Sequence, residues 1–149
     1  MDNSILSEAM TIRAASQSDF SWVNSCYAEI DFVASKPGDF VAIAELGMKR
    51  IGLGRLVPVE GMIGELGGMY VLPEYRRGNV ARSIVQFLLD SSRFSVLYCI
   101  PFSRLSAFYE AFGFRPVSNG ASIPAEVGKK FSWCKQHYHE SVNLLVRQA

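Results

Sequence analysis

The amino-acid sequence predicts an α+β (mixed α/β) fold, with one mostly antiparallel sheet of six to seven strands and helices on both faces. Residues 40–45, 50–59 and 62–71 have strand-like composition and are separated only by short turns, which is typical of an antiparallel meander. After Asn79 the apolar residues recur at helical spacing. Later in the chain, short apolar runs alternate with helical stretches, which indicates crossover connections packed against the same sheet.

The elements of the first half follow in order. Residues 10–15 predict a first strand. Ser18 and Asp19 are suited to cap a helix that ends near residue 28, with Phe20, Val23 and Tyr27 on one face. Residues 35–39 contain lysine, proline, glycine and aspartate, so a turn separates this helix from the three-stranded meander.

The second half contains three further helices and three strands. A helix is predicted from Asn79 to about Asp90, a buried strand over residues 94–100, and a helix over residues 103–112 that Gly113 ends. The remaining elements are a short strand at 114–117, a helix that begins at Pro124 and runs to about residue 135, and a last strand at 141–147.

Length and composition predict one globular domain over residues 1–149. Hydrophobic residues make up 49% of the chain and charged residues 19%, which is enough apolar surface for a core. The formal net charge is +1, so we expect no nucleic-acid partner and no membrane partner held by charge. No apolar run approaches the roughly 18 residues that cross a bilayer.

The cysteines indicate a reducing, cytoplasmic environment. Cys26, Cys99 and Cys134 are odd in number and widely spaced, so a disulfide framework is not expected. Residues 1–4 lack the basic and apolar pattern of a signal peptide.

The junction formed by residues 71–81 carries the strongest functional pattern. A strand ends, the chain turns through Arg76, Arg77, Gly78 and Asn79, and a helix begins. The first N–H groups of a helix lack internal partners, and with the helix dipole they bind anions such as a diphosphate. Two arginines would add charge-assisted contacts. The same pattern is equally typical of a solvated loop before an ordinary helix.

These residues resemble motif A of the GNAT superfamily, the GCN5-related N-acetyltransferases. The match runs through Arg76, Arg77, Gly78, Asn79, Val80 and Ala81. Residues 107–114, Ala-Phe-Tyr-Glu-Ala-Phe-Gly-Phe, resemble motif B, and the predicted strand order is similar to the GNAT fold over nearly the whole chain. Two positions depart from the pattern. Asn79 replaces a glycine for which the family geometry suggests a positive φ, and Phe102 replaces an asparagine that bonds the pantetheine arm, a bond that is missing or moved to Ser103.

The resemblance implies an enzyme that transfers an acetyl group from acetyl-CoA to an amine by direct attack in a ternary complex. The co-substrate would lie in a splay between the fourth and fifth strands, which a bulge at Gly67 and Gly68 would open. The backbone of Met69, Tyr70 and Val71 would contact the acyl carbonyl and pantetheine. The pyrophosphate cradle would comprise Arg76, Arg77, Gly78, Asn79, Val80, Ala81 and Arg82, and Ser103 would contact the pantetheine.

Two side chains are candidates for proton transfer in that reaction. Glu65 is the candidate general base, with a structural carboxylate as the alternative. Tyr109 is the candidate general acid, because a phenol pKa of about 10 is matched to a thiol pKa of about 8.5. The alternative for Tyr109 is an ordinary core tyrosine.

The acceptor is expected to be a small-molecule amine or a protein amine. Tyr27, Glu29 and Asp31 either line its pocket or are ordinary loop residues. Residues 124–147 are the candidate interface of a homodimer. An acyl-cysteine on Cys99 is an alternative to direct transfer.

Three other interpretations compete with that of an enzyme. A catalytically silent CoA-binding module fits the departures at Asn79 and Phe102. A nucleotide-binding P-loop lacks the lysine that should follow Gly78. Cys134, His137 and His139 resemble metal ligands, but zinc usually needs four, so no metal is expected.

Overall fold

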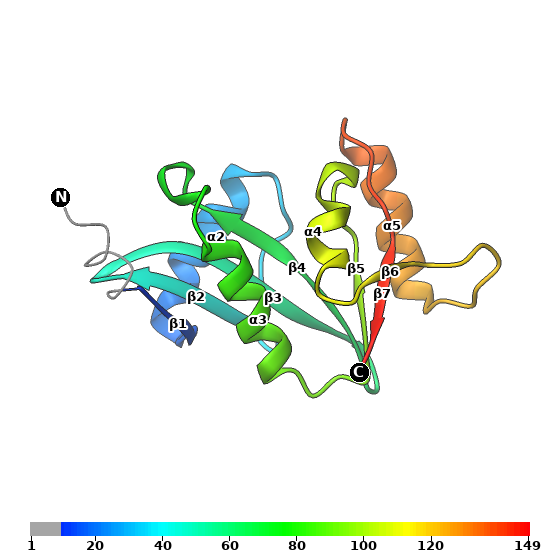
Figure 1. The fold of residues 1–149 in the computed structure, drawn as a ribbon, viewed down its shortest axis with the longest axis horizontal. Helices are drawn as coiled ribbons and strands as arrows, with labels where there is room; N and C mark the ends of the chain where they lie inside the picture. The colour runs from blue at the N-terminus through cyan, green and yellow to red at the C-terminus, as the bar shows by residue number, and fades with distance from the viewer. Residues whose placement is uncertain (1–9) are drawn as a thin grey trace. The chain divides into compact units, whose positions relative to one another are not determined.

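The computed structural model describes residues 10–149 (Figure 1). The expectation about a signal peptide concerns residues 1–4 and lies outside this range. The chain forms two compact units. We call residues 10–56 with Gly68–Ser92 the first unit, and Val57–Gly67 with Arg93–Ala149 the second unit. No helix within residues 10–149 is long and apolar enough to cross a membrane.

The predicted fold class is confirmed: within residues 10–149, seven strands form one sheet in the order β1-β2-β3-β4-β5-β7-β6, in which β4 and β5 pair in parallel. The strands are β1 (Met10–Ala14), β2 (Phe40–Leu46), β3 (Lys49–Glu60), β4 (Ile63–Val71), β5 (Val96–Cys99), β6 (Arg115–Pro116) and β7 (Leu145–Gln148). The helices are α2 (Phe20–Glu29), α3 (Val80–Ser91), α4 (Ser106–Glu110) and α5 (Ala125–His137), with single 3-10 turns at Gln17–Asp19, Pro73–Tyr75 and Ser103–Leu105.

In the first unit, α2 and α3 cover opposite faces of the strands (Figure 1). Successive side chains of a strand point to opposite faces. Leu53 of β3 is fully buried in a cluster with Val23 and Tyr27 of α2. A side chain at the neighbouring Gly54 would instead meet Ile84 of α3 at 3.0 Å and Leu88 at 3.2 Å. Glycine at this position therefore lets α3 approach the sheet closely.

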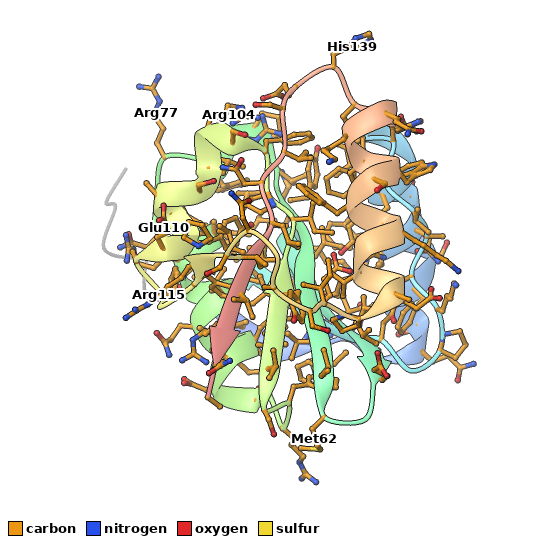
Figure 2. The ribbon with its side chains drawn as sticks, turned by 90° about the vertical axis from the view of Figure 1, so that its right-hand side faces the viewer. Met62, Arg77, Arg104, Glu110, Arg115 and His139 are labelled. Atoms are coloured by element: carbon orange, nitrogen blue, oxygen red, sulfur yellow. The ribbon has the colours of Figure 1, made fainter. Side chains whose placement is uncertain are left out.

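In the second unit, α4 and α5 lie on opposite faces of β5 and β7 (Figure 2). β4 pairs with β5 over three residues only, from Ile63 opposite Val96 to Glu65 opposite Tyr98. Register partners in adjacent strands share one face of a sheet. Glu65 and Tyr98 therefore point to the same side of these strands, at the last registered pair.

The predicted elements all form, with shifted boundaries. The helix expected over residues 103–112 consists of the turn Ser103–Leu105 followed by α4, and it stops before Gly113, whose φ of +96° suits glycine. The last strand begins at Leu145 rather than at residue 141. Val142 instead forms an isolated antiparallel bridge with Phe102.

Candidate active site

The junction between β4 and α3 in the first unit is a helix start without a side-chain cap. Asn79 is the N-cap residue of α3, and its side chain makes no capping hydrogen bond. The Ser83 N–H bonds the Asn79 carbonyl at 2.9 Å, so the intrahelical ladder starts at Ser83. The N–H groups before it have no place in that ladder, which is the arrangement that binds phosphate.

Two residues of this junction differ from what their types suggested. Asn79 has φ −93° and ψ 18°. The expectation of a positive φ at Asn79 is therefore wrong, because the residue leads directly into a right-handed helix. A side chain added at Gly78 would meet only the Tyr75 carbonyl oxygen, at 3.9 Å. Within the part of the chain that the structure describes, neither the backbone conformation nor close packing requires glycine at position 78.

The two arginines of the junction have different roles. Arg76 donates from Nε to the Val71 carbonyl oxygen at 2.8 Å, and its guanidinium lies 5.5 Å from the centre of the Tyr70 ring. Arg76 thus ties the loop to the end of β4. The Val71 carbonyl, which was expected to contact pantetheine, already accepts this hydrogen bond. Arg77 is exposed and projects outward (Figure 2).

Glu65 is buried in the second unit and is paired with a lysine that sequence reasoning missed. Lys130 of α5 donates from Nζ to both carboxylate oxygens of Glu65, at 2.9 and 2.8 Å. The Glu65 side chain is 10% exposed and that of Lys130 is 37% exposed. The pair joins residues 65 positions apart, and no local sequence motif marks Lys130.

Tyr109 and Cys99 are buried, and burial determines their protonation. Tyr109 of α4 is 5% exposed and packs edge-on against Phe108 and Phe114. Burial raises the pKa of the Tyr109 phenol well above its usual value. The expectation of an ordinary phenol pKa is therefore wrong. Burial also raises the pKa of the Cys99 thiol, and a protonated thiol is a poor nucleophile, which disfavours an acyl-cysteine.

Ser103 belongs to a polar network with the chain before β7. Its hydroxyl donates to the Asn143 side-chain oxygen at 3.1 Å and accepts from the Ser141 hydroxyl at 2.8 Å. The Asn143 amide nitrogen donates to the Ser106 hydroxyl at 2.6 Å. An asparagine amide thus lies beside Ser103 although the sequence has Phe102 where the family pattern has asparagine.

Two of the residues that resemble metal ligands, Cys134 and His137, are part of the packing around α5. Cys134 is buried, and the His137 ring stacks on Trp133 with ring centres 4.2 Å apart. Within residues 10–149 no three His, Cys, Asp or Glu side chains are grouped so that they could hold a metal ion.

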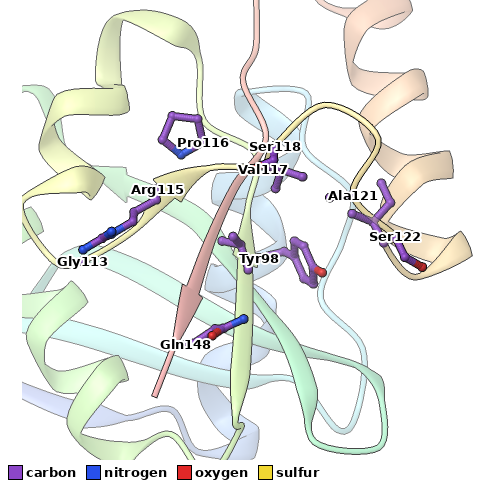
Figure 3. Close-up of a pocket in the computed structure, with 11 residues that line it drawn as sticks. Tyr98, Gly113, Arg115, Pro116, Val117, Ser118, Ala121, Ser122 and Gln148 are labelled. Atoms are coloured by element: carbon purple, nitrogen blue, oxygen red, sulfur yellow. The ribbon is translucent and has the colours of Figure 1, made fainter.

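The second unit also contains a pocket of about 540 Å³ that the sequence did not predict (Figure 3). Its walls come from β5, β6, β7 and the chain that leads to α5. Tyr98, Arg115, Ser118, Ser122 and Gln148 give it polar groups. Tyr98 is the register partner of Glu65.

A sequence profile described as "Acetyltransferase (GNAT) domain" matches residues 37–116, which is more than half of the chain. The chain belongs to the GNAT family. The matched span includes residues 76–81, which resemble motif A, and also Glu65 and Tyr109. No curated protein sequence matches the chain.

Solved structures share the GNAT fold at low sequence identity. N-acetylglutamate synthase from Neisseria gonorrhoeae, complexed with coenzyme A and N-acetyl-glutamate, is 17% identical with a TM-score of 0.69, covering 93% of this chain and 35% of that chain. The chain thus spans about a third of that protein. Rv2747 from Mycobacterium tuberculosis, in complex with CoA and NLQ, is also 17% identical, with a TM-score of 0.70 and coverage of 93% and 99%. Escherichia coli ElaA is 12% identical, with a TM-score of 0.68 and coverage of 93% and 99%.

Proposed function

We propose that the protein is an acyl-CoA-dependent N-acyltransferase that transfers an acetyl group from acetyl-CoA to an amine by direct attack in a ternary complex. The observation that carries the proposal is the junction between β4 and α3. The Asn79 side chain makes no capping hydrogen bond, and within the described residues 10–149 neither backbone conformation nor close packing requires glycine at position 78. A diphosphate lying against Gly78 accounts for both features, since backbone must approach phosphate closely.

The cradle of this proposal uses mainly backbone groups. The N–H groups of Val80, Ala81 and Arg82 bind pyrophosphate oxygens, and the free ends of the Arg76 and Arg77 guanidiniums add positive charge. The backbone of Met69, Tyr70 and Val71 contacts the pantetheine and the acyl carbonyl. The Met69 N–H takes the oxyanion position, because a donor aimed at that oxygen stabilises the tetrahedral intermediate. Ser103 contacts the pantetheine through its hydroxyl.

Glu65 acts as the general base and Tyr109 assists the leaving thiolate. An alkyl amine is mostly protonated at pH 7, so one proton must leave before nitrogen attacks. Lys130 keeps the Glu65 carboxylate in place. Because the Lys130 side chain is partly exposed, it can swing away from one carboxylate oxygen, which then accepts a proton from the incoming amine. A buried phenol of raised pKa stays protonated and hydrogen-bonds the sulfur. Full proton transfer from it to a thiolate is uphill, so stabilisation by that hydrogen bond is its main contribution.

A silent CoA-binding module is the second candidate, and the Glu65–Lys130 pair favours it. Both oxygens of the candidate base accept from the lysine, so a base role needs that contact to open. A module without catalysis would have no such requirement. The two functions share the cradle and differ only in turnover.

The test combines thiol release from acetyl-CoA, measured against a panel of amines, with calorimetric titration of CoA. The panel contains diamines, lysine peptides and amino acids, including glutamate. Binding together with stoichiometric thiol and N-acetyl product supports the enzyme. Binding without turnover on any amine supports the silent module, and no binding rejects both.

We place the protein in the cytoplasm, in keeping with three free, buried cysteines.

A further inference from the structure

The strand β4 has one residue, Gly68 in the first unit, whose backbone conformation departs from that of a strand. Gly68 has φ +62°, in the left-handed region that a regular strand does not use. Its carbonyl oxygen accepts a hydrogen bond from the Tyr27 hydroxyl at 2.9 Å. Tyr27, near the C-terminal end of α2, thus fixes the plane of the peptide between Gly68 and Met69.

Tyr27, the donor of that hydrogen bond, is packed against Arg55. It is fully buried, and the Arg55 guanidinium lies 4.2 Å from the centre of its ring. Arg55 is itself 5% exposed and donates to the Ser35 hydroxyl and the Val33 carbonyl oxygen, each at 2.9 Å. The Tyr27 ring and these two acceptors all stabilise the buried cation.

Tyr27 and Arg55 fill the space that a side chain at position 68 would need. A Cβ atom at Gly68 would lie 2.5 Å from the Tyr27 hydroxyl oxygen and 2.9 Å from the Arg55 Nε. Both contacts are shorter than real side chains allow, so only glycine fits without moving them. Burial also raises the pKa of Tyr27 far above its usual value, which keeps the hydroxyl a donor across the neutral range.

We propose that Tyr27 is a positioning residue that aims the Met69 N–H at the acyl oxygen. The inference rests on the proposed function. The carbonyl of Gly68 and the N–H of Met69 belong to one planar trans peptide, where they point in opposite directions. A hydrogen bond that fixes the carbonyl therefore fixes the direction of the N–H. Accepting a hydrogen bond at the oxygen also polarises the peptide, which makes its N–H a stronger donor.

The test is Tyr27→Phe, which removes one hydroxyl and keeps the ring under Arg55. We expect kcat to fall about 10- to 100-fold, which is less than the loss of an oxyanion donor itself, while the Kd for CoA stays within about twofold. Val23→Ala is the matched control. Val23 is fully buried one turn earlier on α2, and its truncation destabilises the same helix without touching Gly68. Its kcat should stay within about twofold of the wild type, measured well below its Tm.

Gly68→Ala provides a second, independent perturbation. Its methyl group displaces the Tyr27 hydroxyl, so the same loss of kcat is expected with the ring intact. Equal kcat in Tyr27→Phe and Val23→Ala would overturn the positioning role, as would wild-type kcat in Gly68→Ala or a loss of CoA affinity that matches the loss of kcat. If the wild type neither binds CoA nor releases thiol, the proposed function itself fails.

Discussion

Replacing Asp19 with asparagine should destabilise the first unit by removing one buried charge. The Asp19 carboxylate is 2% exposed and lies 2.7 Å from a nitrogen of Arg13 and 3.0 Å from Arg50 Nε. It also accepts from the Ser16 N–H at 2.8 Å. Charge-assisted hydrogen bonds contribute about 1.5–3 kcal/mol each, but both arginine side chains are 35% exposed and water can solvate them after the change. We therefore expect a loss of about 3 kcal/mol at pH 7.

The pH dependence of that loss has a definite sign. The guanidinium of Arg13 holds the pKa of Asp19 well below its ordinary value. The stabilisation is fully present above the unfolded carboxyl pKa of about 4 and is lost as pH falls toward the folded pKa. The difference in unfolding free energy between wild type and Asp19→Asn should therefore shrink by about 1 kcal/mol per pH unit below pH 4.

Urea unfolding followed by tryptophan fluorescence at pH 7 and at pH 3 measures this difference. Asp90→Asn is the control, because Asp90 is an exposed carboxylate on α3 whose loss should cost within about 0.5 kcal/mol. A difference below about 1 kcal/mol at pH 7 for Asp19→Asn would refute the reasoning. So would a difference that is the same at both pH values.

Three further changes test the proposed site. Gly78→Ala should leave Tm unchanged, since a Cβ there has room, yet weaken CoA binding about tenfold or more in a calorimetric titration; unchanged affinity would remove the phosphate from this loop. Glu65→Gln should lower kcat about 100-fold or more, with the largest loss near neutral pH, while the exposed Glu126→Gln has no effect; an unaltered pH–rate profile argues against a base role. Tyr109→Phe should lower turnover about tenfold with CoA affinity retained, and wild-type turnover would reject its role.

Much of the fold could be predicted from local sequence patterns, because the residues that form each pattern lie within a few positions of one another. The change from strand to helical periodicity predicted the β4–α3 junction, and α3 begins at Val80, one residue after the predicted start at Asn79. Gly113 ends the helix before it with a positive φ, as its residue type suggested. Single residues could not be placed so well. Asn79 was expected at a positive φ from the family pattern, but its capping position requires a negative one.

Contacts between residues that are far apart in the chain could not be predicted from the sequence. Lys130 has no motif, and only the docking of α5 brings it to Glu65. Tyr27 was expected on one face of a helix with Phe20 and Val23, and either to line the acceptor pocket or to be an ordinary loop residue. Its contact with Arg55 of β3, whose guanidinium lies 4.2 Å from the ring centre, joins residues that are far apart in the sequence. The raised pKa of Tyr109 likewise follows from tertiary burial, which residue type does not encode.

The central claim is that the uncapped start of α3 binds the pyrophosphate of an acyl-CoA used for N-acylation. The most direct measurement compares kcat/KM for acetyl-CoA and for acetyl-pantetheine, which carries the same thioester without phosphates, at one amine concentration. The account predicts a value at least about 100-fold higher for acetyl-CoA, because binding energy from the phosphates serves the reaction. Equal values for the two donors, or turnover of neither with any amine, would contradict it.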